Sequence, residues 1–284
     1  MSTDSKITAR EQAEIAAANA SGRRPVVFVH GLWLHASSWD RWAEMFREAG
    51  YATLAPGWPD DPETVEASRQ NPDVFAGKGV DEVTEHYAAI IRQLQTPPAI
   101  VGHSFGGMIA QKLLGLGLGA VGVAIDPAPF RGVLPLPFSA LKSAFPVLEN
   151  PANLHRAVML TEEQFRFGFA SAVSEEEAVE LYKTYPIPGS GRPLFQAATA
   201  NLDWTTEASV DTKNATRGPL LLISGEKDNT VPPAITHAEF KQYRKSPALT
   251  ELQDIAGRGH SLTIDSGWRE VADHALAFVQ KHAG

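Results

Sequence analysis

The chain has 284 residues, a formal net charge of −8 and no cysteine. The absence of cysteine excludes disulfides, a thiolate nucleophile and cysteine-ligated metals. The acidic balance argues against nucleic acid or an anionic membrane surface as a partner. The first 20 residues lack the apolar stretch of a secretory signal, and no apolar run reaches the length of a transmembrane helix. We therefore expect a soluble cytoplasmic protein, with no membrane and no nucleic acid as partner.

Residues 1–24 are expected to form a flexible tail and a short helix over 8–20, closed by Gly22. This helix could cover an edge of a sheet or contribute to a dimer contact. The sequence leaves both roles open, and it leaves monomer and homodimer open as well.

From residue 25 to residue 127, predicted strands alternate with predicted helices. The strands are apolar and rich in β-branched residues, as in a parallel sheet that is covered on both faces. They are expected at 25–29, 51–56, 98–101 and 120–125. The helices are expected at 39–49, 81–94 and 108–114, with Ser37 or Ser38 as a cap of the first. Between them, residues 57–79 form a predicted loop that is longer than most connections.

The alternation stops at Ala128 and resumes near residue 214. Within 128–213 no segment has the pattern of a buried strand. Short helices are expected there at 138–145, 161–169, 175–184 and 193–201. We interpret 128–213 as a helical lid inserted into an α/β core that comprises 25–127 and 214–284.

The last part of the chain returns to strands and helices. The expected elements are strands at 219–224 and 250–255 and helices at 232–245 and 267–282. Alternating strands and helices predict the α/β class, with a mostly parallel central sheet that is flanked by helices.

A serine stands at the sharpest predicted turn of the chain. Gly102, Ser104 and Gly106 form a Gly-x-Ser-x-Gly pattern between a strand and a helix. Glycine on either side removes side chains that would collide with the neighbouring strand and helix. The turn would expose the hydroxyl above the sheet, at a helix N-terminus whose N–H groups are free. Glycine-rich turns of this kind also bind phosphate or simply pack, so the motif needs its context.

Two further polar groups follow later strands. Asp228 comes after the strand at 219–224, and His260 comes after the strand at 250–255. A serine hydroxyl needs an imidazole to accept its proton, and the imidazole needs a carboxylate to orient it. Taken alone, Asp228 could cap a turn and His260 could lie in a surface loop. Together with Ser104 they supply each role once, at the edge where α/β sheets place their sites.

The motifs as a set resemble those of the α/β-hydrolase superfamily. They comprise His30-Gly31, the run from Gly102 to Gly107, Gly225-Glu226-Lys227-Asp228 with Val231-Pro232, and Gly259-His260. The resemblance extends from residue 25 to the C-terminus. It implies the α/β-hydrolase fold, with Ser104 as nucleophile, His260 as general base and then acid, and Asp228 as the orienting carboxylate.

The same resemblance indicates an oxyanion hole and a rival for the acid. The N–H of Phe105 and the N–H of Leu32, or else of neighbouring Trp33, would stabilise the developing negative charge. Asp126 also ends a strand, and some members of the superfamily, including zearalenone-type lactonases, carry the acid there. We prefer Asp228 and expect Asp126 to be a structural carboxylate bonded to backbone or to His30.

A serine nucleophile points to acyl transfer. We expect hydrolysis of a carboxylic ester or lactone of a largely apolar small molecule, since the lid is rich in phenylalanine and leucine. Trp33 and Trp58 are candidates for the pocket, and His35 is expected at the surface. The alternatives are a cofactor-free haloperoxidase or perhydrolase, a C–C bond or amide hydrolase, and a non-catalytic ligand-binding member of the fold. No motif for a metal or a cofactor is visible, so we expect neither.

Overall fold

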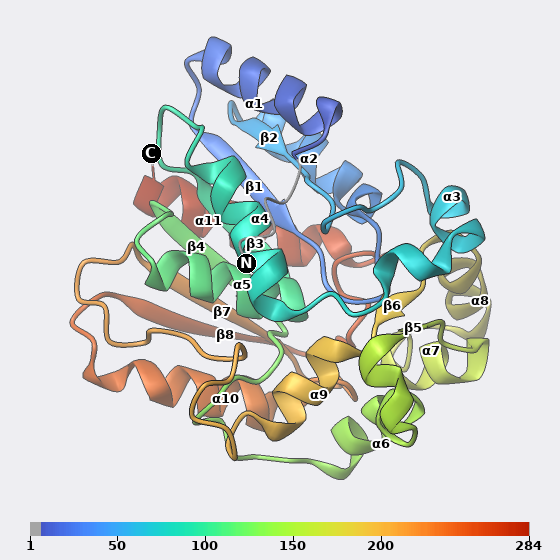
Figure 1. Ribbon diagram of the computed structural model, residues 1–284. Helices are drawn as coiled ribbons and strands as arrows, with labels where there is room; N and C mark the ends of the chain where they lie inside the picture. Colours follow the sequence, from blue (N-terminus) through green and yellow to red (C-terminus); the bar gives the residue numbers. More distant parts are fainter. Residues whose placement is uncertain (1–6, 284) are drawn as a thin grey trace.

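The computed structural model describes residues 7–283, and its centre is a six-stranded parallel sheet (Figure 1). The strand order is β2-β1-β3-β4-β7-β8. The strands are β1 (Pro25–Val29), β2 (Ala52–Leu54), β3 (Ala99–His103), β4 (Val121–Ile125), β7 (Leu220–Gly225) and β8 (Thr250–Ile255). The fold is therefore the expected α/β architecture, with β3 and β4 at the middle of the sheet.

Helices cover both faces of this sheet. They are α1 (Ala9–Ser21), α2 (Asp40–Glu48), α4 (Val80–Ile91), α5 (Phe105–Gly115), α10 (Pro233–Gln242) and α11 (Trp268–Ala283). Helix α3 (Val65–Gln70) lies away from the sheet, and its Arg69 donates to the carbonyls of Tyr182, Lys183 and Pro186. Short 3₁₀ helices lie at η1 (Ala36–Trp39), η2 (Pro72–Phe75), η3 (Pro151–His155) and η4 (Tyr243–Lys245). In the described part of the chain, no helix is long and apolar enough to cross a membrane.

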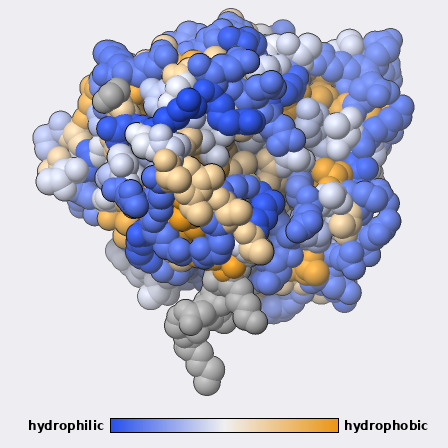
Figure 2. Space-filling model, turned by 90° about the horizontal axis from the view of Figure 1, so that it is seen from above, coloured by the Kyte–Doolittle hydropathy of each residue, from blue (hydrophilic) through white to orange (hydrophobic). Residues whose placement is uncertain are grey.

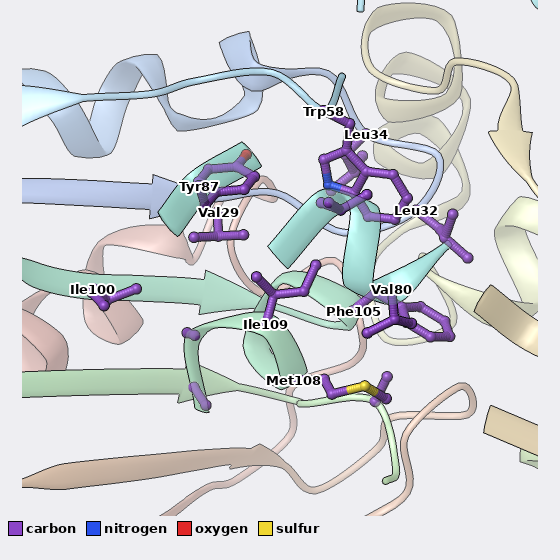
Figure 3. Close-up of a cluster of buried hydrophobic side chains, with 14 of the residues drawn as sticks. Val29, Leu32, Leu34, Trp58, Val80, Tyr87, Ile100, Phe105, Met108 and Ile109 are labelled. Carbon is purple, nitrogen blue, oxygen red and sulfur yellow. The ribbon is translucent and has the colours of Figure 1, made fainter. Parts of the chain in front are cut away.

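Alternate side chains of the strands build two separate cores. Val27 and Val29 of β1 pack on one face with α4 and α5, whereas Val26 and Phe28 pack on the other with α2 and α11. Figure 3 shows the first of these cores, where Val29, Ile100 and Ile109 come together from β1, β3 and α5. Burial on both faces explains why these strands are continuous apolar runs. By contrast, the face of the molecule seen in Figure 2 is mostly hydrophilic, with its apolar residues scattered.

Helix α1 packs against β2, the edge strand of the sheet. Thr8 and Glu11 form a capping box at its start. The other oxygen of Glu11 lies 3.0 Å from Nε2 of His86 in α4, and both side chains are buried. Of the two roles left open for this helix, the structure places it at the sheet edge.

The segment between β4 and β7 holds a cluster of four helices, and we call residues 128–213 the insertion. Its helices are α6 (Phe138–Leu148), α7 (Glu162–Gly168), α8 (Glu175–Thr184) and α9 (Arg192–Thr199). They lie together beyond the ends of β4 and β7 (Figure 1). Phe165 and Phe169 of the insertion belong to the same core cluster as one face of the sheet, so the insertion packs firmly on the core.

Two details differ from the sequence predictions. Residues 57–79 were expected as a loop but contain α3 and η2. The insertion was expected to lack buried strands, yet β5 (Ala157–Val158) and β6 (Gly189–Ser190) pair antiparallel, and β6 is buried. Elements of two to six residues carry too little periodicity for the sequence to reveal them.

Candidate active site

Ser104 occupies the turn between β3 and α5 with strained backbone angles. Its φ is 57° and its ψ is −124°, in a region that residues with a side chain rarely adopt. The flanking glycines make this turn sterically possible. A Cβ on Gly102 would lie 2.0 Å from the carbonyl oxygen of Gly106, and a Cβ on Gly106 would lie 2.0 Å from that of Val29. The motif therefore works as the sequence suggested, by close approach of backbone to backbone.

Asp228 and His260 form a buried pair. The imidazole Nδ1 lies 2.5 Å from Asp228 Oδ2, and both side chains are fully shielded from solvent. Asp228 Oδ1 accepts the N–H groups of Thr230 and Val231, at 2.6 and 2.8 Å. The carboxylate is thus fixed by backbone donors and aims its second oxygen at the histidine, as the acid of a triad must.

The other nitrogen of His260 has no protein partner. Nε2 is buried and makes no hydrogen bond to any described residue, including Ser104. The ring is held between His103, with ring centroids 4.6 Å apart, and Phe169, with centroids 4.7 Å apart. His103 directly precedes Ser104, and burial with the nearby His260 lowers the pKa of His103 well below its usual range, so it stays neutral. In a substrate-free enzyme the bond from nucleophile to base is often unformed and tightens only around substrate.

Asp126 lies beside this pair but does not bond to His260. Its Oδ1 accepts the N–H of Gly225 at 2.7 Å, and its Oδ2 has no partner among the described residues. His30, the other partner that the sequence suggested for Asp126, contacts Asp61 instead. Burial, with the neighbouring Asp228 carboxylate, raises the pKa of Asp126 well above its usual range. The structure thus bonds Asp126 to backbone, one of the two partners that the sequence suggested, and its surroundings favour the protonated form.

The loop after β1 reaches Ser104 because Gly31 has no side chain. A Cβ at Gly31 would lie 2.8 Å from both Ser104 Cβ and the carbonyl oxygen of His103. The backbone N–H groups of Leu32 and Phe105 donate no hydrogen bond to any other group in residues 7–283. Free donors on both sides of a nucleophile are what an oxyanion hole requires.

Trp33 ties this loop to the insertion. Its φ is 65°, again unusual for a residue with a side chain. The indole Nε1–H donates to the carbonyl of Val158 in β5 at 3.0 Å, and the Trp33 carbonyl accepts the N–H of Ile187 at 2.9 Å. The next residue, Leu34, forms a β-bridge with Pro186. The conformation of the oxyanion loop thus depends on contacts more than 120 residues away in the chain.

Sequence reasoning missed a second buried pair behind the loop. His30 Nε2 lies 3.2 Å from Asp61 Oδ2, and both are buried. Trp58 stacks on His30 at 5.7 Å and donates its indole N–H to the His30 carbonyl. Trp58 therefore supports His30 and does not line the cavity at Ser104, contrary to expectation. The only indication of this pair in the sequence is the acidic dipeptide Asp60-Asp61, and the sequence does not show which of the two carboxylates is buried.

His35 was expected at the surface, and this is wrong. It is 6% exposed, and its two ring nitrogens contact the Ser37 hydroxyl and the Pro62 carbonyl, both at 2.9 Å. It also caps η1. The helix for which Ser37 or Ser38 was expected as the cap is α2, and its N-cap is Trp39, without a side-chain hydrogen bond. A hydrogen bond to a residue 27 positions later in the chain cannot be read from local sequence.

A cavity of about 190 Å³ opens at the nucleophile. Ser104, Phe105 and Trp33 form part of its wall, so Trp33 lies where the sequence suggested. The rest of the wall is almost entirely apolar and comes from the segment 128–148, from α9 and from the start of α10. It comprises Ala128, Pro129, Phe130, Val133, Leu134, Pro135, Leu136, Ala140, Leu141, Ser143, Ala144, Leu148, Leu194, Ala197, Ala198, Asn201, Thr230, Val231 and Ile235.

Within residues 7–283, one group of side chains has the composition of a metal site. His103, Asp126 and His260 can bring one ligand atom each within 4.8 Å of one another. Metal binding requires deprotonated ligands, and the raised pKa of Asp126 opposes this. A carboxyl group that favours its protonated form is a poor metal ligand, so this cluster is better suited to holding a proton than a metal ion.

Comparison with known proteins places the chain in a family. The model described as "Alpha/beta hydrolase family" matches residues 26–274. No curated protein matches the chain significantly.

Solved structures share the fold at low identity. A monoacylglycerol lipase from Paleococcus ferrophilus superposes with a TM-score of 0.63 at 20% identity, covering 91% of this chain and 94% of its own. An extracellular alpha/beta-hydrolase from a Paenibacillus species gives 0.64 at 19% identity, covering 89% and 98%. A pyrethroid hydrolase from Sphingobium faniae gives 0.62 at 16% identity, covering 92% and 98%.

Proposed function

Because the chain belongs to the alpha/beta hydrolase family, we propose that it is a serine hydrolase that cleaves a carboxylic ester or lactone of a largely apolar small molecule. The observation that carries the proposal is the buried pair of Asp228 and His260, 2.5 Å apart, beside a serine on a strained turn at an apolar cavity. Two of the similar structures are named as a lipase and a pyrethroid hydrolase, which agrees with hydrolysis.

In the proposed reaction Ser104 Oγ attacks the carbonyl carbon of the ester. His260 Nε2 takes the hydroxyl proton, and Asp228 stabilises the imidazolium. The carbonyl oxygen becomes an oxyanion, which the N–H groups of Leu32 and Phe105 bind. His260 then gives its proton to the leaving alkoxide, so that an alcohol departs and Ser104 is acylated.

The second half of the reaction repeats these roles with water. His260 takes a proton from water, whose oxygen attacks the acyl carbon. The oxyanion collapses, the bond to Ser104 Oγ breaks, and the serine recovers a proton from His260. The products are a carboxylic acid and an alcohol, or a hydroxy acid when the substrate is a lactone.

Turnover of p-nitrophenyl acetate and butyrate tests the proposal. We expect the wild type to hydrolyse both and Ser104→Ala to hydrolyse neither above the background rate, with the circular dichroism of the two proteins unchanged. Activity should fall at acid pH, because a protonated imidazole cannot accept the serine proton. Equal activity in Ser104→Ala would refute the serine mechanism.

A further inference from the structure

Few of the side chains that line the cavity are polar. Apart from Ser104, its polar side chains already bond within the protein. Asn201 binds the backbone at Gly132 and Val133, and Thr230 donates to the carbonyl of Gly168. Ser143 donates to the carbonyl of Asn229 and Trp33 to that of Val158. A polar substrate group placed there would lose its water and find few partners, which is unfavourable.

The wall also contains no charged side chain. None of its residues is Asp, Glu, Lys, Arg or His. Lys142 is the single ionisable residue of the apolar run 133–148, and its Nζ lies 4.1 Å from the ring centre of Phe167, in the insertion. An ionised substrate would therefore meet no countercharge beside the nucleophile.

The apolar wall continues out of the cavity onto the surface. Leu134, Leu136 and Leu141 line the cavity and are still 76%, 65% and 42% exposed. We call these three residues the rim. Phe138 and Phe145, on the same segment, are also exposed. Exposed leucines that are continuous with a catalytic cavity mark a binding surface, whereas single scattered ones need no explanation.

The cavity is also small. At about 190 Å³ it is smaller than the 300–1,000 Å³ range of common ligand sites. A hydrocarbon group that is longer than this cavity extends beyond its mouth. The surface on which the excess can lie without exposure to water is the rim.

Building on the proposed function, we propose that the natural substrate is an uncharged ester with a hydrocarbon group longer than the cavity. This group runs from Ser104 through the cavity and over Leu134 and Leu136 at its mouth. The rim thereby determines specificity for chain length, and the uncharged wall excludes carboxylate-bearing esters.

The test compares p-nitrophenyl butyrate and octanoate, below the concentration at which either aggregates. In Leu134→Asp and Leu136→Asp, kcat/KM for octanoate should fall about tenfold, the loss expected when roughly two methylene groups stay in water. For butyrate, whose chain is shorter, the loss should be smaller, so the ratio of octanoate to butyrate should fall. Leu202→Asp is the matched control, because Leu202 is 85% exposed and does not line the cavity. It should leave the ratio of the two substrates unchanged.

A charged substrate completes the comparison. The mono-p-nitrophenyl ester of glutaric acid has an acyl chain close to that of butyrate and ends in a carboxylate. We expect the wild type to hydrolyse it at least tenfold more slowly than butyrate. Equal rates for these two esters, or an unchanged ratio of octanoate to butyrate in both rim variants, would overturn the proposal.

A binding measurement separates this inference from the proposed function. Ser104→Ala should bind methyl decanoate, followed by tryptophan fluorescence because Trp33 lines the cavity, and Leu136→Asp in that background should weaken binding about tenfold. If the wild type hydrolyses no ester but Leu136→Asp still weakens binding of methyl decanoate, the proposed reaction is wrong and the proposed role of the rim is supported. If esters are hydrolysed and the rim variant binds as tightly as its parent, the rim proposal fails alone.

Discussion

Two buried carboxyl groups lie beside His260, and they differ in their contacts. Asp228 contacts His260 and is held by two backbone N–H groups, whereas Asp126 contacts the backbone of Gly225, and burial beside Asp228 raises its pKa. Two carboxyl groups this close cannot both ionise at low cost.

We therefore predict effects of very different size for the same substitution at the two positions. Asp228→Asn should lower kcat by about 10²–10⁴-fold, since an amide neither fixes the imidazole tautomer nor stabilises its positive charge. Asp126→Asn should change kcat by less than about threefold, because an amide can still accept from the Gly225 N–H. Steady-state kinetics on p-nitrophenyl butyrate decides, and a larger loss in Asp126→Asn than in Asp228→Asn would reverse the assignment.

The raised pKa of Asp126 also predicts a dependence of stability on pH. The folded state raises the pKa of Asp126, so above the unfolded value of about 3.9 it binds a proton that the unfolded chain has lost. Stability should fall as pH rises from there toward the folded pKa. Asp126→Asn removes this slope.

The check is urea unfolding of the wild type and Asp126→Asn at several values between pH 4.5 and 8. The free energy of unfolding of the variant, minus that of the wild type, should increase with pH. A difference that is constant or decreases over this range would mean that Asp126 is ionised in the folded protein.

At the scale of elements, the insertion holds the oxyanion loop through the Trp33 indole. The bond from Nε1–H to the Val158 carbonyl joins the loop after β1 to β5. Trp33→Phe keeps an aromatic ring in the cavity wall and removes this bond. We predict a loss of about tenfold in kcat, because misplaced oxyanion donors stabilise the transition state less well, and a smaller change in KM.

Trp42→Phe is the matched control for this prediction. The Trp42 indole also donates to a backbone carbonyl, that of Thr263 at 2.9 Å, but on the opposite face of the sheet. It should lower the thermal midpoint without lowering kcat of the folded enzyme. Equal effects of the two substitutions on kcat would show that Trp33 has no special link to the site.

Most of the sheet and its flanking helices could be predicted from the sequence, because their signals are local. Continuous apolar runs predicted β1, β3, β4 and β7. The observed bounds of α8 and β8 are those predicted from the sequence. The turn at Ser104 was predictable for the same reason, since its glycines are neighbours in sequence. Asp61 and His35 were not, because their partners lie 27 or more residues away and local pattern carries no record of them.

At the scale of the whole molecule, α1 covers the edge of the sheet, and one of its contacts with α4 is a buried pair. Glu11 contacts His86 and also accepts the N–H of Thr8 at 2.7 Å. The backbone bond and the His86 partner lower the pKa of Glu11 against the opposing effect of its burial, which is the larger single influence. The carboxylate is therefore ionised and engaged on both sides.

We predict that Glu11→Ala lowers the free energy of unfolding by about 3 kcal/mol, the usual loss when one partner of a buried pair is removed. Urea denaturation measures it. Asp273→Ala is the control, since its pair with Arg269 is exposed and should be worth less than about 1 kcal/mol. Comparable losses in both variants would mean that α1 is not anchored by this pair.

The central claim is that Ser104 is a nucleophile activated by His260 and Asp228, and covalent labelling tests it most directly. The folded wild type is treated with a fluorophosphonate, and the labelled peptide is identified by mass spectrometry. The account predicts one phosphonyl group per chain on Ser104, no label in Ser104→Ala, and slower labelling in Asp228→Asn. A folded protein that takes no label, or takes it at another residue while Ser104 stays free, would contradict it.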